Sequence, residues 1–362
     1  MSFIRTIRYT AAVTAIATAA SLTIAPEAKA TEVINLTAVD GYPPKTLWVK
    51  EFINFFIPEI DKRLAKTGNF KIKWNQAWAG QITKKKKVLQ GLQTGLGDIG
   101  VVTTVFHADK VPLHVLAYAT PFVTSDPGLV AKTFDKLAET EPAIKETWKK
   151  YNQHYLTNLA VFDNYQLFSK EKMERLADFK GKKINGAGMN LRYLKSLGAV
   201  GVGGSSVVYY NNMKTGVVDG SILWAEGAVT FKFPEVAPYM LRADMGSANS
   251  KAITMNLDRW NSLDKEVQVA IQEAAYAYRD HVSAMAIKIS DQAYDNFTKM
   301  GGTITMMSKN DRNDWIKMMP NISKDWAAGL EKKGIPGNKI LASYMNTMRA
   351  AKQPIIRQWD KE

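Results

Sequence analysis

Hydrophobic and polar positions change their spacing many times along the chain. Short apolar runs, and runs in which apolar and polar residues alternate, predict β-strands, while apolar residues that recur every three or four positions predict helices. The expected strands lie at 33–39, 70–74, 98–104, 156–162, 166–169 and 217–224. The expected helices lie at 47–66, with an interruption near Pro58, and at 83–94, 127–151, 190–197 and 206–215. This order predicts an α/β fold with mainly parallel sheets that are covered by helices.

One apolar stripe is much longer than the others. Between Val267 and Phe297 the apolar residues keep steps of three and four, behind the helix-capping residues Asn261 and Ser262. Such a helix would have roughly 35 residues and a length of about 50 Å, whereas a lobe made from half the chain should be only about 40 Å across. We therefore expect it to run along two lobes with a ligand cleft between them. The alternative is a coiled-coil arm, which the irregular flanking charges disfavour.

The beginning of the chain has the features of an export signal. Arg5 and Arg8 precede an uncharged, mostly apolar run that ends near Ile24, and Ala28-Lys29-Ala30 has the small-x-small pattern of a signal peptidase site. We interpret residues 1–30 as a signal peptide that is cleaved near Ala30–Thr31. The alternative, a membrane anchor, needs about 20 strongly apolar residues, and this run is shorter. The mature protein is expected to work in the periplasm without spanning the membrane.

The composition narrows the possible chemistry. The 362 residues include 48 Lys+Arg and 34 Asp+Glu, for a formal net charge of +14, and no cysteine. A chain of this length is expected to form about two domains. The absence of cysteine excludes disulfides, thiol nucleophiles and thiolate metal sites, and the four histidines have no HxxxH or HExxH spacing. We therefore expect neither a metal site nor a cofactor.

Two motifs invite a nucleotide or nucleic-acid interpretation. The run Gly198–Gly204 has Ser206 where a dinucleotide fingerprint needs its third glycine, and it follows a predicted helix, so we expect a turn. Lys84–Lys87 precede the apolar positions of a helix, which predicts a solvated first helical turn. No nucleic-acid partner is expected, because no recognisable binding module accompanies the lysines. The positive charge would instead concentrate anions or contact anionic lipids.

Several segments resemble the solute-binding proteins of TRAP transporters. The run AWAGQITKKKKVLQGLQTGLGDIG, which begins at Ala77, is similar to their glycine loop, helix and T-G-x-x-D-I-G strand. Pro121–Val123, Leu176–Ile184 (LADFKGKKI) and Met213–Gly220 (MKTGVVDG) are similar to three further motifs of these proteins, in the same order. The similarity covers nearly all of the mature chain. On the basis of these motifs, the chain is identified as a member of the C4-dicarboxylate-binding, DctP-type family.

This resemblance implies a fold and a function. The fold would be that of a two-lobed periplasmic binding protein (type II-like) with a long helix spanning both lobes. Lobe I would comprise 31–158 plus 247–285, and lobe II 159–246 plus 286–362. The protein would bind a small organic solute, commonly a carboxylate, between the lobes and deliver it to the membrane permease subunits of a TRAP-type transporter. It would not be an enzyme.

The chain departs from the family pattern at the ligand. Most relatives have an arginine directly after the K-x-K-I strand, where it clamps the ligand carboxylate through two hydrogen bonds. Here that position is Asn185, and a second arginine of some relatives aligns with Tyr165. Arg192 is out of phase with the neighbouring leucines and is expected to face outward. Since losing a charge-assisted pair weakens binding, carboxylate binding by this route is not expected.

The expected ligand-binding residues come from strand ends in both lobes. They are Asp40, Tyr42, Thr103, Thr104, Asn164, Tyr165, Asn185, Leu223, Trp224 and Glu226. A tyrosine, a tryptophan and a carboxylate around one cleft can hold an ammonium group through cation–π contact and charge pairing. This favours a polar or zwitterionic solute or an amine over a plain dicarboxylate. The alternative is that Trp224 packs beneath the strand between the lobes and that Glu226 is solvated.

Two other classes of function stay open at this point. An exported enzyme with Asp/Glu acid–base chemistry in the same cleft would need a second carboxylate beside Glu226, for which Asp40 is the candidate. A surface adhesin that uses its basic face would bind anionic polymers in a salt-dependent way and would need no pocket.

Overall fold

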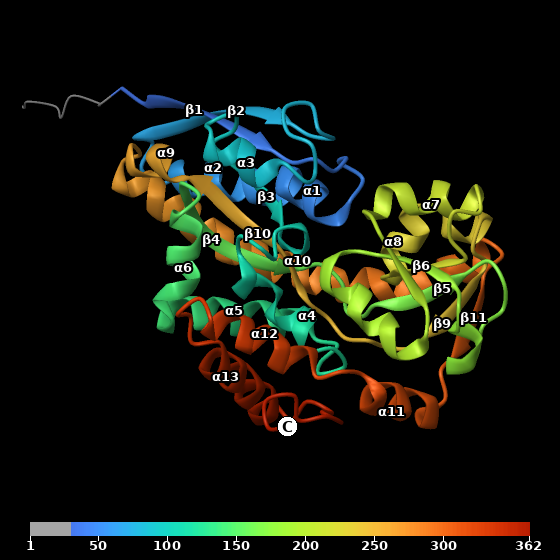
Figure 1. Ribbon diagram of the computed structural model, residues 1–362. Helices are drawn as coiled ribbons and strands as arrows, with labels where there is room; N and C mark the ends of the chain where they lie inside the picture. Colours follow the sequence, from blue (N-terminus) through green and yellow to red (C-terminus); the bar gives the residue numbers. More distant parts are fainter. Residues whose placement is uncertain (1–29) are drawn as a thin grey trace, which may run out of the picture.

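The computed structural model describes residues 30–362 and has the expected α/β fold with two lobes (Figure 1). Each lobe is built on its own β-sheet. The predicted signal peptide, apart from Ala30, lies outside the described residues. Between residues 30 and 362, no helix combines the length and the apolar composition that crossing a membrane requires.

The first sheet has five strands in the order β2-β1-β3-β10-β4. β1 pairs in parallel with β2 and β3, whereas β10 is antiparallel to β3 and β4. The strands are β1 (Glu32–Val39), β2 (Phe70–Ala77), β3 (Ile99–Thr103), β4 (Gln153–Ala160) and β10 (Asn249–Asn256). The associated helices are α1 (Leu47–Glu51), α2 (Ile57–Leu64), α3 (Val88–Gln93), α4 (Leu116–Ala119), α5 (Pro127–Thr140), α6 (Pro142–Lys149) and α9 (Leu257–Asn261).

The second sheet has six strands in the order β11-β9-β5-β8-β6-β7. β5 is antiparallel to β8 and β9, and the other pairs are parallel. The strands are β5 (Gln166–Ser169), β6 (Lys183–Gly186), β7 (Val200–Gly203), β8 (Gly220–Leu223), β9 (Tyr239–Arg242) and β11 (Thr303–Met306). The helical elements in this part of the chain are η4 (Leu176–Phe179), η5 (Gly188–Leu197), α7 (Ser206–Lys214), α8 (Ala225–Thr230) and η6 (Phe233–Glu235).

Both sheets are mixed. Five of the nine strand pairs are parallel and four are antiparallel, so parallel pairing predominates only narrowly. The two strands that run against their neighbours are β5 and β10, and each enters its sheet directly from the other lobe. The links from β4 to β5 and from β9 to β10 are short and join strands of different sheets.

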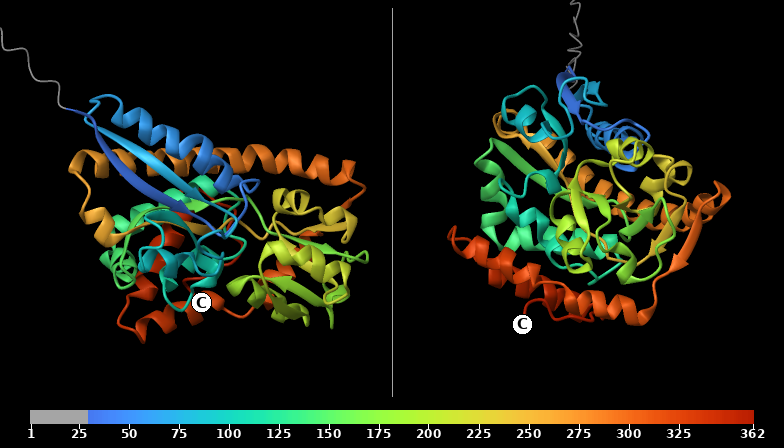
Figure 2. Two further views of the ribbon diagram at one scale, coloured as in Figure 1. Left: turned by 90° about the horizontal axis from the view of Figure 1, so that it is seen from above. Right: turned by 45° about the vertical axis from the view of Figure 1, so that its right-hand side comes forward.

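The long helix predicted from the apolar stripe is confirmed. α10 (Lys265–Lys299) has 35 residues, which corresponds to about 52 Å. It contacts β4, α5 and α2 beside the first sheet and α8 and β11 beside the second, and Figure 2 shows it along both lobes. The helix begins after Asp264, whose carboxylate accepts a hydrogen bond from Glu266 N, rather than after Asn261 or Ser262.

The C-terminal segment departs from the expected assignment of 286–362 to lobe II. After α11 (Lys309–Met318), α12 (Ile322–Glu331) contacts α4, and α13 (Gly337–Ala350) contacts α5. The indole of Trp326 donates to Pro112 O (2.8 Å), and that of Trp359 donates to Pro121 O (3.0 Å). This segment therefore returns to the first sheet's side (Figure 1). The other lobe boundaries stay a prediction.

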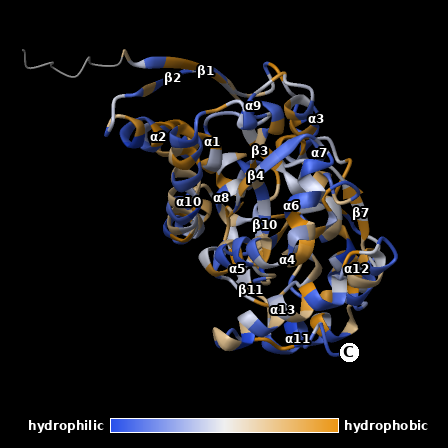
Figure 3. Cartoon of the chain, turned by 90° about the vertical axis from the view of Figure 1, so that its left-hand side faces the viewer, coloured by the Kyte–Doolittle hydropathy of each residue, from blue (hydrophilic) through white to orange (hydrophobic). Residues whose placement is uncertain are grey.

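Two further local predictions need correction, and a third is confirmed. The helix expected over 83–94 begins only at Val88, and Lys84–Lys87 form a turn ahead of it. The glycine-rich run contains strand β7 rather than only a turn, although Gly198, at φ +66°, ends η5 as expected. The interruption expected near Pro58 in the helix over 47–66 is confirmed, because the π-helical turn η1 (Phe52–Phe56) ends two residues before this proline. Hydrophilic and hydrophobic residues alternate along α2 and α10, which is typical of helices that cover a sheet (Figure 3).

Candidate functional site

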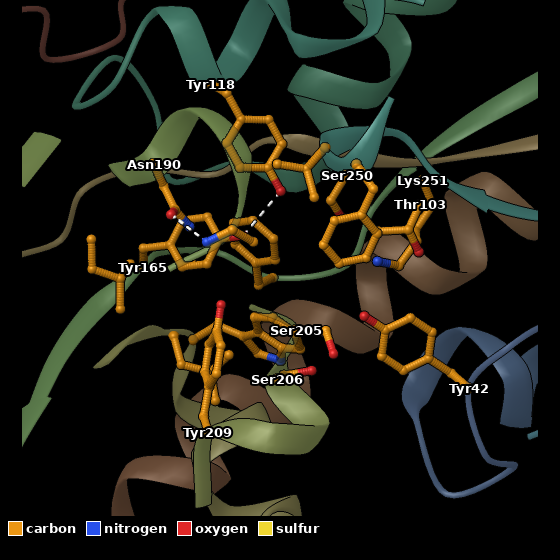
Figure 4. Close-up of a pocket in the computed structure, with 17 residues that line it drawn as sticks. Tyr42, Thr103, Tyr118, Tyr165, Asn190, Ser205, Ser206, Tyr209, Ser250 and Lys251 are labelled. Carbon is orange, nitrogen blue, oxygen red and sulfur yellow. Dashed lines mark hydrogen bonds between the residues drawn. The ribbon is translucent and has the colours of Figure 1, made fainter. Parts of the chain in front are cut away.

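A pocket lies between the two lobes and is lined by residues from both of them (Figure 4). Seven of its lining side chains are aromatic: Tyr42, Phe106, Tyr118, Phe162, Tyr165, Tyr209 and Trp224. Five are polar and uncharged: Thr103, Asn190, Ser205, Ser206 and Ser250. Lys251 is the single charged residue among those that line it within residues 30–362. The cavity measures about 30 Å³, which is room for roughly two water molecules. An organic solute can therefore enter only if the lobes move apart.

Five of the ten residues predicted for the site line this pocket. They are Tyr42, Thr103, Tyr165, Leu223 and Trp224. Trp224 stacks on Phe162, with ring centroids 5.4 Å apart and planes 17° apart. The hydroxyl of Tyr165 lies 3.0 Å from that of Tyr118, so the two tyrosines share a hydrogen bond inside the site. The other five, Asp40, Thr104, Asn164, Asn185 and Glu226, do not line the pocket.

Asp40 lies behind the pocket wall and is 1% exposed. Its carboxylate accepts hydrogen bonds from Tyr42 N (2.8 Å) and from the Trp48 indole (2.9 Å). Burial raises the pKa of Asp40 and lowers the pKa of Lys251, and the attraction between the two opposes both shifts. Asp40 thus orients the aromatic wall and supplies a countercharge, rather than contacting the cavity itself.

Asn164 and Thr104 hold the connections between the lobes. The side-chain oxygen of Asn164 accepts from Gly246 N (3.0 Å) and from the Ser125 hydroxyl (2.9 Å), which ties the β4–β5 link to the β9–β10 link. Thr104 donates to Asn249 O (3.2 Å) at the start of β10. Their polar atoms bond to the protein itself, which explains why neither side chain lines the cavity.

Asn185 is completely buried within the second sheet. Its side-chain oxygen accepts from the Asn212 amide on α7 (3.1 Å), and its own amide nitrogen has no partner within the described part of the chain. Because side chains alternate between the faces of a strand, Asn185 is directed to the helix-covered face. Arg192 is half-exposed and 4.0 Å from Asp325, outside the pocket, so its outward orientation is confirmed.

Glu226 positions an aromatic wall of the pocket. One carboxylate oxygen accepts from the Trp224 indole (2.9 Å), and the other accepts from the Thr230 hydroxyl (2.6 Å). Trp224 lines the pocket as expected, whereas the expectation for Glu226 needs correction, because its carboxylate bonds to the Trp224 indole. Glu226 therefore does not join Tyr165 and Trp224 in lining the cavity.

The residue that sequence reasoning missed is Lys251. It lies in β10, a strand that was not among the predicted ones, and every residue of that strand is buried. A lysine inside the otherwise apolar or uncharged stretch NSKAITMN was the available signal, because lysine is almost never fully buried without a partner. Tyr118, Asn190, Ser205, Ser206, Tyr209 and Ser250 were also missed, and no local motif distinguishes them.

Comparison with known proteins agrees with this architecture. The family model for bacterial extracellular solute-binding proteins, family 7 (DctP), matches residues 41–330. The ectoine-binding periplasmic protein TeaA of Halomonas elongata is 22% identical over 281 residues, which cover 75% of this chain and 79% of that protein.

Solved structures show the same fold. A TRAP solute-binding protein from Rhodoferax ferrireducens, in complex with copurified benzoate, superposes with a TM-score of 0.79 at 15% identity, covering 88% of this chain and 98% of that one. A TRAP periplasmic solute-binding protein from Bordetella bronchiseptica, with bound mandelate, has a TM-score of 0.76 at 20% identity, with 88% and 99% covered. Because the family model spans most of the sequence, this chain belongs to the DctP family of TRAP-type extracellular solute-binding proteins.

Proposed function

We propose that this protein is the periplasmic receptor of a TRAP-type secondary transporter. It captures a small polar organic solute in the pocket between its lobes and delivers it to the membrane permease, without catalysing a reaction. The observation that carries the proposal is the pocket itself, since its walls come from both sheets and meet where the lobes are joined. Export to the periplasm rests on the predicted signal peptide and on membership of an extracellular family.

The connections between the lobes suit a hinge. Two short chain segments cross side by side, and Met245 N donates to Tyr165 O (3.1 Å), while the Ser247 hydroxyl donates to Phe162 O (2.7 Å). On the far side of the pocket the lobes touch through an exposed contact, in which the Lys45 ammonium donates to Thr230 O (3.3 Å). A bound solute that contacts both lobes stabilises the closed form, and the permease can then distinguish loaded from empty receptor.

The chemistry of the pocket favours binding over catalysis. No Asp or Glu is present among the described residues that line it, so the exported enzyme with two convergent carboxylates finds no support. Asp40 and Glu226 each bond to a tryptophan indole instead. The aromatic walls suit the body of an organic solute, and the solutes named for related proteins, namely ectoine, benzoate and mandelate, are small organic molecules.

A thermal-shift screen of organic acids, amines and zwitterions tests this proposal. A solute at 100 times its Kd should stabilise the protein by about 2.7 kcal/mol, and so raise Tm by about 5 °C. Ser206→Phe fills the pocket from α7 and should abolish the shift. Val208→Phe introduces the same ring on the exposed side of that helix and should leave the shift unchanged. If no solute raised Tm, the proposed function would be wrong.

A further inference from the structure

Lys251 presents a buried ammonium group to the pocket. The residue is 3% exposed, and its Nζ lies 4.2 Å from the centroid of the Trp48 ring and 5.4 Å from that of Tyr42. Within residues 30–362, this Nζ makes no hydrogen bond to a protein acceptor and no ion pair within 4.0 Å. The nearby carboxylate, that of Asp40, accepts hydrogen bonds from Tyr42 N and the Trp48 indole instead. A buried ammonium with free donors is costly unless an anion completes its shell.

A β-bulge brings a second donor to the same place. Asn249 pairs with Ala160 and Lys251 with the preceding residue of β4, Leu159, so Ser250 has no partner in the ladder. Such a bulge turns side chains away from strict alternation, and both Ser250 and Lys251 line the cavity. The hydroxyls of Ser250 and Ser206 are buried and have no hydrogen-bond partner within the described residues. Figure 4 shows the ammonium and the Ser206 hydroxyl directed into the same space.

The lysine turn at 84–87 adds positive charge at this site. The Lys85 ammonium lies 5.9 Å from the ring centroid of Tyr42, and that of Lys86 lies 5.4 Å from that of Phe106. Both rings line the pocket, so this turn belongs to its surroundings. The site contains three lysines, Lys251, Lys85 and Lys86, and the carboxylate of Asp40. Its net charge is therefore positive before a solute binds, and this charge attracts anions into the cleft.

We propose that Lys251, together with the hydroxyls of Ser206 and Ser250, binds the single carboxylate of a solute whose flat, apolar body lies among the aromatic walls. This inference rests on the proposed function and names its ligand class. One buried cation suits one carboxylate, and seven aromatic side chains suit a flat body better than a second charged group.

The test compares each acid with its neutral amide. Wild-type protein is titrated by calorimetry with benzoate, (R)-mandelate and pyroglutamate, with the corresponding amides, and with benzylamine. The acids should bind at least about 30-fold more tightly than their amides. Lys251→Met should remove this preference, Lys251→Arg should retain part of it, and Lys183→Met, an exposed lysine on β6, should change nothing.

The outcomes separate this inference from the proposed function. Binding of amides or of benzylamine as tight as that of the acids would overturn the inference and leave the receptor function standing, as would unchanged acid affinity in Lys251→Met. If none of these compounds binds, the inference fails, and the thermal-shift screen then decides whether the receptor function stands. Should Lys251→Met not fold, Ser250→Ala decides instead, because it should weaken acid binding several-fold more than amide binding.

Discussion

Closure of the lobes depends on one glycine. Gly188, at the start of η5 in the second lobe, has φ +54°, and a Cβ at this position would lie 2.4 Å from Val105 O and 2.6 Å from Val105 Cγ2. Val105 belongs to the short helix η2 (Thr104–Phe106) that follows β3 of the first sheet. The absence of a side chain at 188 is what lets the two lobes come this close. We predict that Gly188→Ala weakens solute binding.

The expected magnitude follows from these distances. A carbon atom approaches a carbonyl oxygen to about 3.3 Å, so the lobes must separate locally by about 0.9 Å. A gap of this size forfeits a quarter to a half of each dispersion contact across the closed surfaces, and overpacking of this kind costs about 2 kcal/mol. Moving the lobes apart would relieve this contact. The whole cost therefore falls on closure and should raise Kd about 30-fold.

Gly216 provides the matched control. It also has a positive φ, +75°, but an added Cβ there meets nothing within 4 Å. Both substitutions incur the left-handed backbone strain of about 1 kcal/mol, and only Gly188→Ala obstructs closure. Calorimetry with the acid that raises Tm most should give an affinity for Gly216→Ala within twofold of wild type, and small-angle scattering should show the solute-bound Gly188→Ala protein to be more open. Equal affinities of the two variants would refute the argument.

Three further changes have definite expected results. Glu226→Gln should weaken solute binding about fivefold, because the charge-assisted hydrogen bond that orients Trp224 becomes a neutral one. Asp135→Asn should lower the free energy of unfolding by about 3 kcal/mol in urea titrations, since it removes the buried carboxylate that pairs with the half-buried guanidinium of Arg279 and leaves only the exposed Asp280 as its charged partner. His154→Phe should flatten the pH dependence of stability between pH 6.5 and 4, because burial lowers the pKa of His154 to about 4.

Asp280→Asn is the control for Asp135→Asn. Asp135 is buried and also accepts hydrogen bonds from Tyr155, Thr157 and Asn158. Asp280 binds the same arginine from an exposed position, so Asp280→Asn should lower the free energy of unfolding by less than about 1 kcal/mol. Equal costs for the two aspartates would contradict the argument. The unfolded chain protonates His154 near pH 6.5 but the folded one only near pH 4, so stability is lost as the pH falls through this window. If the slope of stability against pH were unchanged in His154→Phe, the argument for His154 would be wrong. If solute affinity were unchanged in Glu226→Gln, the argument for Glu226 would be wrong.

Local patterns were sufficient for much of the fold. An alternating run located β2, short apolar runs located β3 and β5, and the apolar stripe located α10. A half-buried element leaves a periodic trace in the sequence, and a short fully buried strand leaves an unbroken apolar run. The strand β10 was not predicted. Its residues are all buried, so it shows no alternation, and the polar side chains of Asn249 and Thr254 interrupt its apolar run.

For the site, the sequence alone determined the family, the two-lobed architecture and five of the seventeen residues that line the pocket, since order and spacing of motifs and strand ends are properties of the chain itself. Tertiary structure decided which side chains reach the solute. Asp40 and Tyr42 are two residues apart, yet only Tyr42 lines the cavity, and Lys251 lines it because a bulge turns β10. Strand register and the approach of two lobes choose the face that each side chain occupies, and neither is encoded in a local pattern.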